Sequence, residues 1–142
     1  MLPEKFYDTL EAVLYIALHS GGRAVSSTEI CKYKQVSPRH LEQVMQLLVR
    51  HHILKGVTGP KGGYTLAREK RKMTLAEIWH IFDVHPVQNE SHTPIQQRIQ
   101  HTVKIELNDL IVRYLQTVTL DDLCKQITQE AMDRSGRSDF II

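Results

Sequence analysis

Cysteine is scarce in this sequence of 142 residues. Cys31 and Cys124 stand far apart, which excludes a disulfide framework and the paired cysteine spacing of structural zinc sites. Long apolar runs are also missing: no stretch approaches the roughly 20 residues that a membrane helix needs, and the first residues lack the basic and then apolar pattern of a secretion signal. We therefore expect a cytoplasmic protein, and a hydrophobic content of 42% is sufficient for a folded core.

The net charge of +2 hides two halves of opposite sign. Residues 1–72 contain 12 lysines and arginines against 6 acidic residues, whereas residues 73–142 contain 6 against 10. The basic excess lies entirely in the N-terminal half, so an anionic partner is expected to bind there.

Hydrophobic spacing predicts three helices in the basic half, over about residues 4–19, 26–33 and 38–51. The second helix starts at a capping box formed by Ser26 and Glu29. The third starts with Ser37 as its cap and Pro38 in its first position, where the missing N–H costs nothing. Its apolar residues form one stripe, which leaves long polar side chains on the opposite face.

Two short strand-like runs follow the third helix. Residues 53–58 and 64–66 flank a glycine-rich segment over 59–63, which predicts a β-hairpin with a five-residue tip. A basic stretch over 68–72 then leads to a further helix over about 75–82, which starts at a capping box of Thr74 and Glu77.

The C-terminal half is expected to contain a loop, a long helix and a tail. Residues 84–93 carry no periodicity and indicate a loop, after which Thr93 and Pro94 start a helix that runs to about Leu115. Its apolar residues occupy more than one face, so we expect this helix to pair with a second copy of the chain. A short closing helix ends this part at about residue 127, and a mobile polar tail over 128–142 follows.

This order of elements is that of a winged helix-turn-helix domain. The fold class is therefore predicted as mainly α with a small β-hairpin: a winged helix-turn-helix domain over residues 1–83 and a long dimerisation helix within 94–127. In such domains the third helix enters the major groove, and the hairpin tip contacts phosphate or the minor groove. Arginine can pair with guanine there, and glutamine with adenine. The candidate DNA-binding residues are Ser37, Arg39, His40, Gln43, Arg50, Thr58, Lys61 and Gly62.

Two motifs together carry a family resemblance. The run from Ser37 to Gln43, with Leu-Glu-Gln at its end, and the Gly-Pro-Lys-Gly-Gly-Tyr hairpin over 59–64 resemble the Rrf2 family of bacterial transcription regulators, which includes IscR-, NsrR- and CymR-like proteins. The segments over 14–18 and 118–123 also resemble that family's first helix and the end of its long helix. The resemblance implies a homodimeric regulator that binds a roughly palindromic operator in double-stranded DNA.

The resemblance also implies an iron–sulfur cluster in many members, held by three cysteines before the long helix. Residues 84–104 contain no cysteine here. We therefore predict no cofactor and a colourless protein, with both cysteines packed as small apolar residues. The alternative is an iron–sulfur or metal-sensing regulator with atypical ligands, drawn from Cys31, Cys124, His85, His92 and His101.

Two other function classes are weighed against a DNA-binding regulator. A winged-helix module could instead bind an anionic protein surface, but Arg39 and Gln43 favour base reading. An enzyme is not expected, because phosphate-loop, His-Glu-x-x-His and glycine-framed serine motifs are missing. The signal is expected to be a small effector or a partner protein, which acts where the 75–82 helix, the 84–93 loop and the long helix meet.

Overall fold

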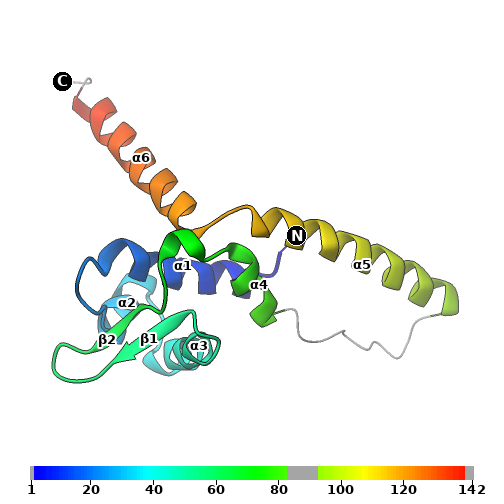
Figure 1. Ribbon diagram of the computed structural model, residues 1–142, viewed down its shortest axis with the longest axis horizontal. Coiled ribbons are helices and arrows are strands. Elements are labelled where there is room, and N and C mark those ends of the chain that lie inside the picture. Colours follow the sequence, from blue (N-terminus) through cyan, green and yellow to red (C-terminus); the bar gives the residue numbers. More distant parts are fainter. Residues whose placement is uncertain (1, 83–92, 140–142) are drawn as a thin grey trace.

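The computed structural model describes residues 2–82 and 93–139 of the chain. These residues form a mainly helical structure with one two-stranded hairpin (Figure 1), as the sequence predicts. In chain order the elements are α1 (Glu4–His19), α2 (Ser27–Lys34), α3 (Pro38–Arg50), β1 (Leu54–Val57), β2 (Gly63–Leu66), the 3-10 helix η1 (Lys70–Lys72), α4 (Leu75–Phe82), α5 (Pro94–Gln116) and α6 (Leu120–Asp139).

The core is built around α1, which crosses the middle of the folded body (Figure 1). Phe6, Val13 and Ile16 of this helix are almost fully buried. The Phe6 ring meets Trp79 of α4 edge-on, with 5.6 Å between the ring centroids. Burial of each large apolar side chain contributes about 1.5–3 kcal/mol. The buried residues that α3, β1, α4 and α6 add to this core are Leu41, Met45, Leu48, Leu54, Leu75, Ala76, Ile78, Trp79, Ile81 and Leu120.

The starts of α2 and α3 lie where the sequence places them. Ser26 caps α2 by accepting a hydrogen bond from the Glu29 N–H at 3.2 Å, and Ser37 caps α3 by accepting one from the His40 N–H at 3.3 Å. The expected return bond from the Glu29 side chain is replaced by an ion pair with Arg23 at 3.3 Å. Side-chain caps therefore fix both helix starts, as predicted.

The hairpin is shifted by one residue from the prediction. β1 and β2 pair antiparallel, with Val57 opposite Gly63, so Gly63 belongs to the strand and the tip covers residues 58–62. The residue after Gly63, Tyr64, also forms a bridge with Val25. The Tyr64 N–H donates to the Val25 oxygen at 2.8 Å, and the Val25 N–H donates to the Tyr64 oxygen at 2.9 Å, so the backbone stays extended from Gly63 onward.

A backbone bridge joins the domain to the C-terminal helices. Thr74 pairs with Thr119, and the flanking bonds run from the Leu75 N–H to the Val118 oxygen and from the Leu120 N–H to the Met73 oxygen, both at 2.9 Å. From this junction α5 and α6 extend away from the folded body in different directions (Figure 1).

Two predictions about the C-terminal half need correction or lie outside the described residues. The closing helix does not end near Ile127, because α6 continues to Asp139 and most of the expected tail is helical. The expected loop over 84–93 falls outside the described residues except for Thr93, which caps α5 through a capping box with Gln96. No helix in the described ranges is long and apolar enough to span a membrane.

Candidate nucleic-acid interface

The orientation of α3 follows from its apolar stripe. Leu41, Met45 and Leu48 recur at helical spacing and are buried against the core. Arg39 and Gln43 lie on the opposite face and are exposed to solvent. Burial of one face therefore directs the candidate base-reading side chains Arg39 and Gln43 toward solvent.

The turn before α3 is also fixed. α2 ends at Lys34, and the next residue, Gln35, caps it in the left-handed conformation with φ of 54°. Residues 35–37 connect the two helices. The side chain of Lys34 is only 8% exposed. Its ammonium group pairs with the Glu11 carboxylate of α1 at 2.5 Å and donates to the backbone carbonyl oxygen of Asp8 at 3.2 Å. This turn and ion pair set the direction in which α3 leaves the core.

The hairpin is pressed against the loop that precedes α2. A Cβ atom on Gly63, whose φ is 152°, would lie 2.2 Å from the Val25 oxygen. Only glycine allows the two backbones to approach this closely. Glycine is therefore required at residue 63. The bridge between Val25 and Tyr64 anchors the start of β2, beside the hairpin tip, to the loop that precedes α2.

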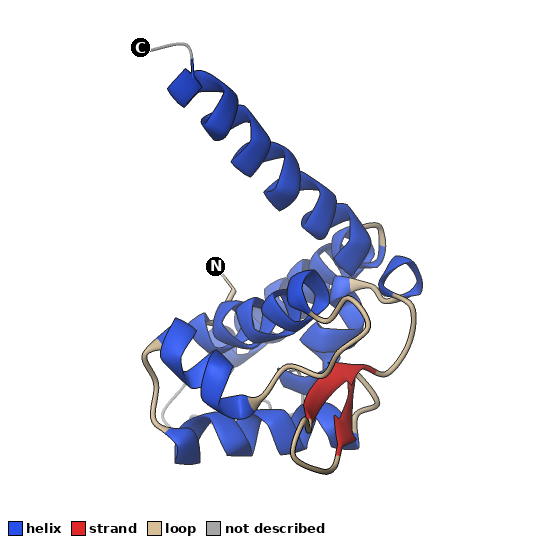
Figure 2. Cartoon of the chain, turned by 90° about the vertical axis from the view of Figure 1, so that its left-hand side faces the viewer, coloured by secondary structure: helices blue, strands red, loops and turns tan. Residues whose placement is uncertain are grey.

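The structure places α3 and the hairpin on one side of the molecule. Both lie along the lower edge in Figures 1 and 2, on the side of the body opposite to the outward course of α6. Of the eight candidate residues, Gly62 is half-buried and the others are exposed: Ser37, Arg39, His40, Gln43, Arg50, Thr58 and Lys61.

Ion pairs neutralise much of the basic run over 68–72. Arg68 pairs with Glu77, Lys70 with Asp121 at 3.7 Å, and Arg71 with Glu69 at 2.7 Å. Over the described ranges no ion pair forms at Arg39, Arg50 or Lys61. The exposed face of α3 and the hairpin tip therefore keep their full positive charge for an anionic partner.

Sequence reasoning missed two cations beside this surface. Lys55 is exposed on β1, and Lys32 of α2 lines a cleft of about 370 Å³ together with Pro38, Glu42 and Tyr64. Neither lysine has an ion-pair partner among the residues that the structure describes. The strand position of Lys55, next to the glycine-rich tip, is the signal that could have identified it.

The described residues do not form a metal site. No group of three or more His, Cys, Asp or Glu side chains is placed to hold a metal within these ranges. Burial raises the pKa of the Cys124 thiol. The raised pKa disfavours the thiolate form, which is the form that binds a metal. Cys31 is half-buried on α2 and His101 is exposed on α5, whereas His85, His92 and most of the loop expected to meet an effector lie outside the described residues.

Comparisons with known proteins agree with this architecture. Residues 2–126 match the model of the Rrf2 family, described as iron-dependent transcriptional regulators. The chain is 30% identical over 126 residues to the HTH-type transcriptional regulator BadM of Rhodopseudomonas palustris, covering 85% of this chain and 79% of that protein. It is 29% identical over 135 residues to the HTH-type transcriptional regulator IscR of Photorhabdus laumondii, and the match covers 90% of this chain and 80% of that protein.

Solved structures show the same fold. The IscR of T. potens superposes with a TM-score of 0.71 at 25% identity, covering 89% of this chain and 88% of that one. The global cysteine regulator CymR of B. subtilis superposes with a TM-score of 0.68 at 24% identity, and the match covers 89% of this chain and 97% of that one. The helix-turn-helix, hairpin and long helix thus recur together in proteins of known structure.

Proposed function

Because the chain belongs to the Rrf2 family of transcriptional regulators, we propose that it reads DNA sequence as a homodimer, through α3 and the hairpin tip of each copy. Arg39 and Gln43 lie near the start of α3, which is the end of the recognition helix that meets base edges. The hairpin tip is then in position to contact the phosphate backbone through Lys61 and Gly62.

One observation carries this proposal: the exposed face of α3 and the hairpin tip lie on the same side of the molecule and carry Arg39, Arg50 and Lys61, none of which has an ion-pair partner among the described residues. A helix face that is merely solvated does not require an adjoining basic hairpin. The nearby basic run over 68–72 differs from this surface, because Arg68, Lys70 and Arg71 each have an acidic partner. Arginine and lysine side chains without acidic partners suit the negative charge of the DNA backbone.

The homodimer is proposed from the exposed apolar residues of α5. Ile99, Leu107, Leu110 and Tyr114 recur at spacings of three to eight residues along one side of the helix, and between 52% and 66% of each is exposed. Only the C-terminal part of α5 packs on the body, where Leu115 is buried and the Trp79 indole donates to Asn108 at 3.3 Å. An apolar stripe of this length on a single chain marks an association surface.

A twofold dimer would present two copies of α3 to the same side of a duplex. The operator would then be roughly palindromic, with half-sites separated by about one helical turn or a multiple of it. This geometry makes the proposed dimer and the proposed operator mutually dependent.

The proposed regulator works without an iron–sulfur cluster, although its family is described as iron-dependent. Support comes from the ligand chemistry: the chain has two cysteines in all, and one of them is buried with a raised pKa. Iron and sulfide analysis of anaerobically purified protein checks this point. We expect neither element in stoichiometric amount. Stoichiometric iron, with visible absorption lost in Cys31→Ala or Cys124→Ala, would contradict it.

The proposed function is tested by selecting duplexes from a random pool with the full chain. We expect a palindromic motif to be enriched by the wild-type protein. A folded Arg39→Ala variant is expected to lose the preference at one base pair in each half-site. If no duplex is enriched over the pool, the DNA-reading function is wrong and a protein-interaction module becomes the better account.

A further inference from the structure

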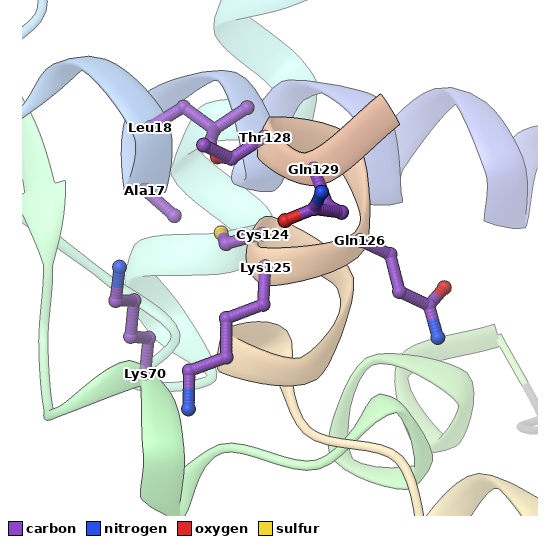
Figure 3. Close-up of a pocket in the computed structure, with 8 residues that line it drawn as sticks. All are labelled: Ala17, Leu18, Lys70, Cys124, Lys125, Gln126, Thr128 and Gln129. Atoms are coloured by element: carbon purple, nitrogen blue, oxygen red, sulfur yellow. The ribbon is translucent and has the colours of Figure 1, made fainter. Parts of the chain in front are cut away.

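A second candidate site lies on the side of the domain away from the hairpin tip. An open cleft of about 690 Å³ separates the end of α1 from η1 and the first turns of α6 (Figure 3). Its volume falls within the range of small-molecule sites. The residues that line it are Ala17, Leu18, Lys70, Cys124, Lys125, Gln126, Thr128 and Gln129.

The cleft has an apolar floor. Figure 3 shows Ala17, Leu18 and the Cys124 sulfur close to one another on the α1 side of the cleft. Cys124 is only 3% exposed, and because burial raises its pKa the sulfur stays in the neutral thiol form. These groups offer an apolar surface against which a hydrocarbon body can pack.

The opposite side of the cleft carries an excess of positive charge. Lys70 and Lys125 share a single carboxylate, because their Nζ atoms lie 3.7 and 3.0 Å from the two oxygens of Asp121. The hydrogen bond from Lys125 lowers the pKa of the Asp121 carboxyl, which is therefore ionised at neutral pH. Among the groups in direct contact, two ammonium groups against one carboxylate leave one positive unit, and the more distant Asp122 carboxylate acts on Lys125 only weakly.

The remaining polar groups can position a ligand. The Thr128 hydroxyl and the carboxamide of Gln129 line the cleft, and Figure 3 shows the Gln129 amide near its centre. The Gln129 amide nitrogen already donates one hydrogen bond to Asp133 at 3.1 Å, so its second N–H and the Thr128 hydroxyl are the groups that can donate to a carboxylate oxygen. A ligand with one negative charge and an apolar body matches both the local charge and the floor, whereas a phosphate dianion would be left with an unbalanced charge.

The cleft is also placed to influence DNA binding. Lys70 lies four residues after the end of β2, so it belongs to the segment that connects the hairpin to α4. Lys125 lies on α6, five residues after Leu120, the last residue of the backbone bridge that joins residues 73–75 to residues 118–120. A ligand held by both lysines would therefore tie the base of the hairpin to the helices of the proposed dimer.

We propose that this cleft binds a small organic carboxylate with an apolar body, and that the bound ligand changes the affinity of the chain for its operator. The binding site stands on the cleft alone, whereas the effect on the operator rests on the proposed DNA-reading function. By linkage, a ligand that alters DNA affinity must itself bind with a different affinity when DNA is present.

The binding test uses the full chain, labelled with 15N, and follows backbone resonances during titration with hexanoate. Hexanamide, which has the same body without the charge, is the matched control ligand, and inorganic phosphate tests for simple charge attraction. We expect hexanoate to shift the resonances of Leu18, Lys70 and Lys125 in a saturable manner. Hexanamide and phosphate are expected to bind at least about fivefold more weakly. Hexanamide lacks the negative charge, and phosphate lacks the apolar body.

Three substitutions separate ligand binding from a structural role. Lys70→Gln and Lys125→Gln should each weaken hexanoate binding by about fivefold, since each removes one cation. Asp121→Asn should instead tighten it, because the competing carboxylate is lost. Lys72→Gln is the matched control, since Lys72 is exposed on the same 3-10 helix but does not line the cleft.

Each outcome decides the proposal. Equal binding of hexanoate and hexanamide, or hexanoate binding that the lysine and aspartate variants leave unchanged in folded protein, would overturn the site. Saturable hexanoate binding at the cleft with unaltered affinity for the selected duplex would overturn the effect on the operator. A chain that binds no duplex would contradict the proposed function, and the titration without DNA would still decide whether the cleft is a site.

Discussion

Arg39 and Lys61 are expected to contribute to DNA binding in different ways. Arg39 lies on the recognition helix, where a guanidinium can pair with a base edge, so Arg39→Ala should cost about 1–3 kcal/mol and relax the preference at one operator position. Lys61 lies at the hairpin tip, so Lys61→Ala should weaken binding to all sequences similarly. It should also reduce the slope of the logarithm of the binding constant against the logarithm of salt concentration, called the salt slope, by about one unit. Fluorescence anisotropy over a range of salt concentrations measures both effects.

Lys5→Ala is the matched control for these two variants, because Lys5 is exposed in the first turn of α1, outside the proposed interface. Its operator affinity and salt slope should equal those of the wild type. The assignment of α3 to the major groove is wrong if Arg39→Ala keeps both the affinity and the base preference of the wild type.

Gly63 makes a residue-scale prediction about stability. Gly63→Ala would place a Cβ atom 2.2 Å from the Val25 oxygen, so the hairpin must move away from the helix-turn-helix. We expect a loss of about 1–3 kcal/mol in the free energy of unfolding, together with weaker DNA binding. Gly56→Ala is the matched control, because a Cβ atom there meets nothing within 4 Å. Urea denaturation of both variants should therefore give clearly different midpoints, and similar midpoints would refute the close approach.

The two thiols should differ in reactivity. Cys31 is half-buried, whereas Cys124 is nearly inaccessible and has a pKa raised by burial, so it forms little thiolate at neutral pH. Iodoacetamide at neutral pH should alkylate Cys31 first, and Cys124 only on unfolding. Mass spectrometry of Cys31→Ala and Cys124→Ala separates the two rates. Rapid alkylation of the native Cys31→Ala variant would contradict the buried position of Cys124.

At the scale of the elements, the apolar stripe of α5 makes the sharpest prediction. Leu107→Asp and Leu110→Asp would each place a carboxylate in the proposed dimer interface, where an unpaired buried charge is costly. Both variants should sediment as folded monomers at concentrations at which the wild type is a dimer. Thr102→Asp is the control, since Thr102 is exposed on the same helix but outside the stripe. A wild-type chain that sediments as a folded monomer at micromolar concentration would refute the dimer.

Helix starts were predicted from the sequence more accurately than helix ends. A cap and a proline give a local signal, so Ser37 with Pro38 and Thr93 with Pro94 mark the first residues of α3 and α5 correctly. The end of α6 has no comparable signal. Residues 128–135 lack apolar periodicity, but glutamine, glutamate, alanine and methionine are good helix formers, and they continue the helix beyond Ile127.

The candidate interface was predicted only in part, because its charge depends on tertiary contacts. The sequence identifies the exposed face of α3 and the glycine-rich tip by periodicity and composition. It does not reveal that the run over 68–72 is paired with Glu69, Glu77 and Asp121, because two of these partners come from other elements. The cleft between α1 and α6 likewise emerges only from the fold.

At the scale of the whole molecule, separate parts would serve the proposed DNA binding and the proposed dimer. The helix-turn-helix and the hairpin occupy one side of the body, and α5 and α6 extend from the junction at residues 73–75 and 118–120 (Figure 1). The proposed dimer would therefore set the distance between two recognition helices through the direction of α5. A change at the junction would alter that distance, and the fixed spacing of DNA half-sites would convert it into a change of affinity.

The central claim is that two copies of α3 read one duplex. The most direct test compares the affinity of the full chain for its selected duplex with its affinity for a duplex that carries inserted base pairs. Inserting about five base pairs between the half-sites turns one of them to the opposite face of the helix. The account predicts that two chains bind the selected duplex together and that this insertion lowers the affinity at least about tenfold, to that of a single half-site. Equal affinity for the selected duplex, the spaced duplex and a single half-site, with one chain bound to each, would contradict it.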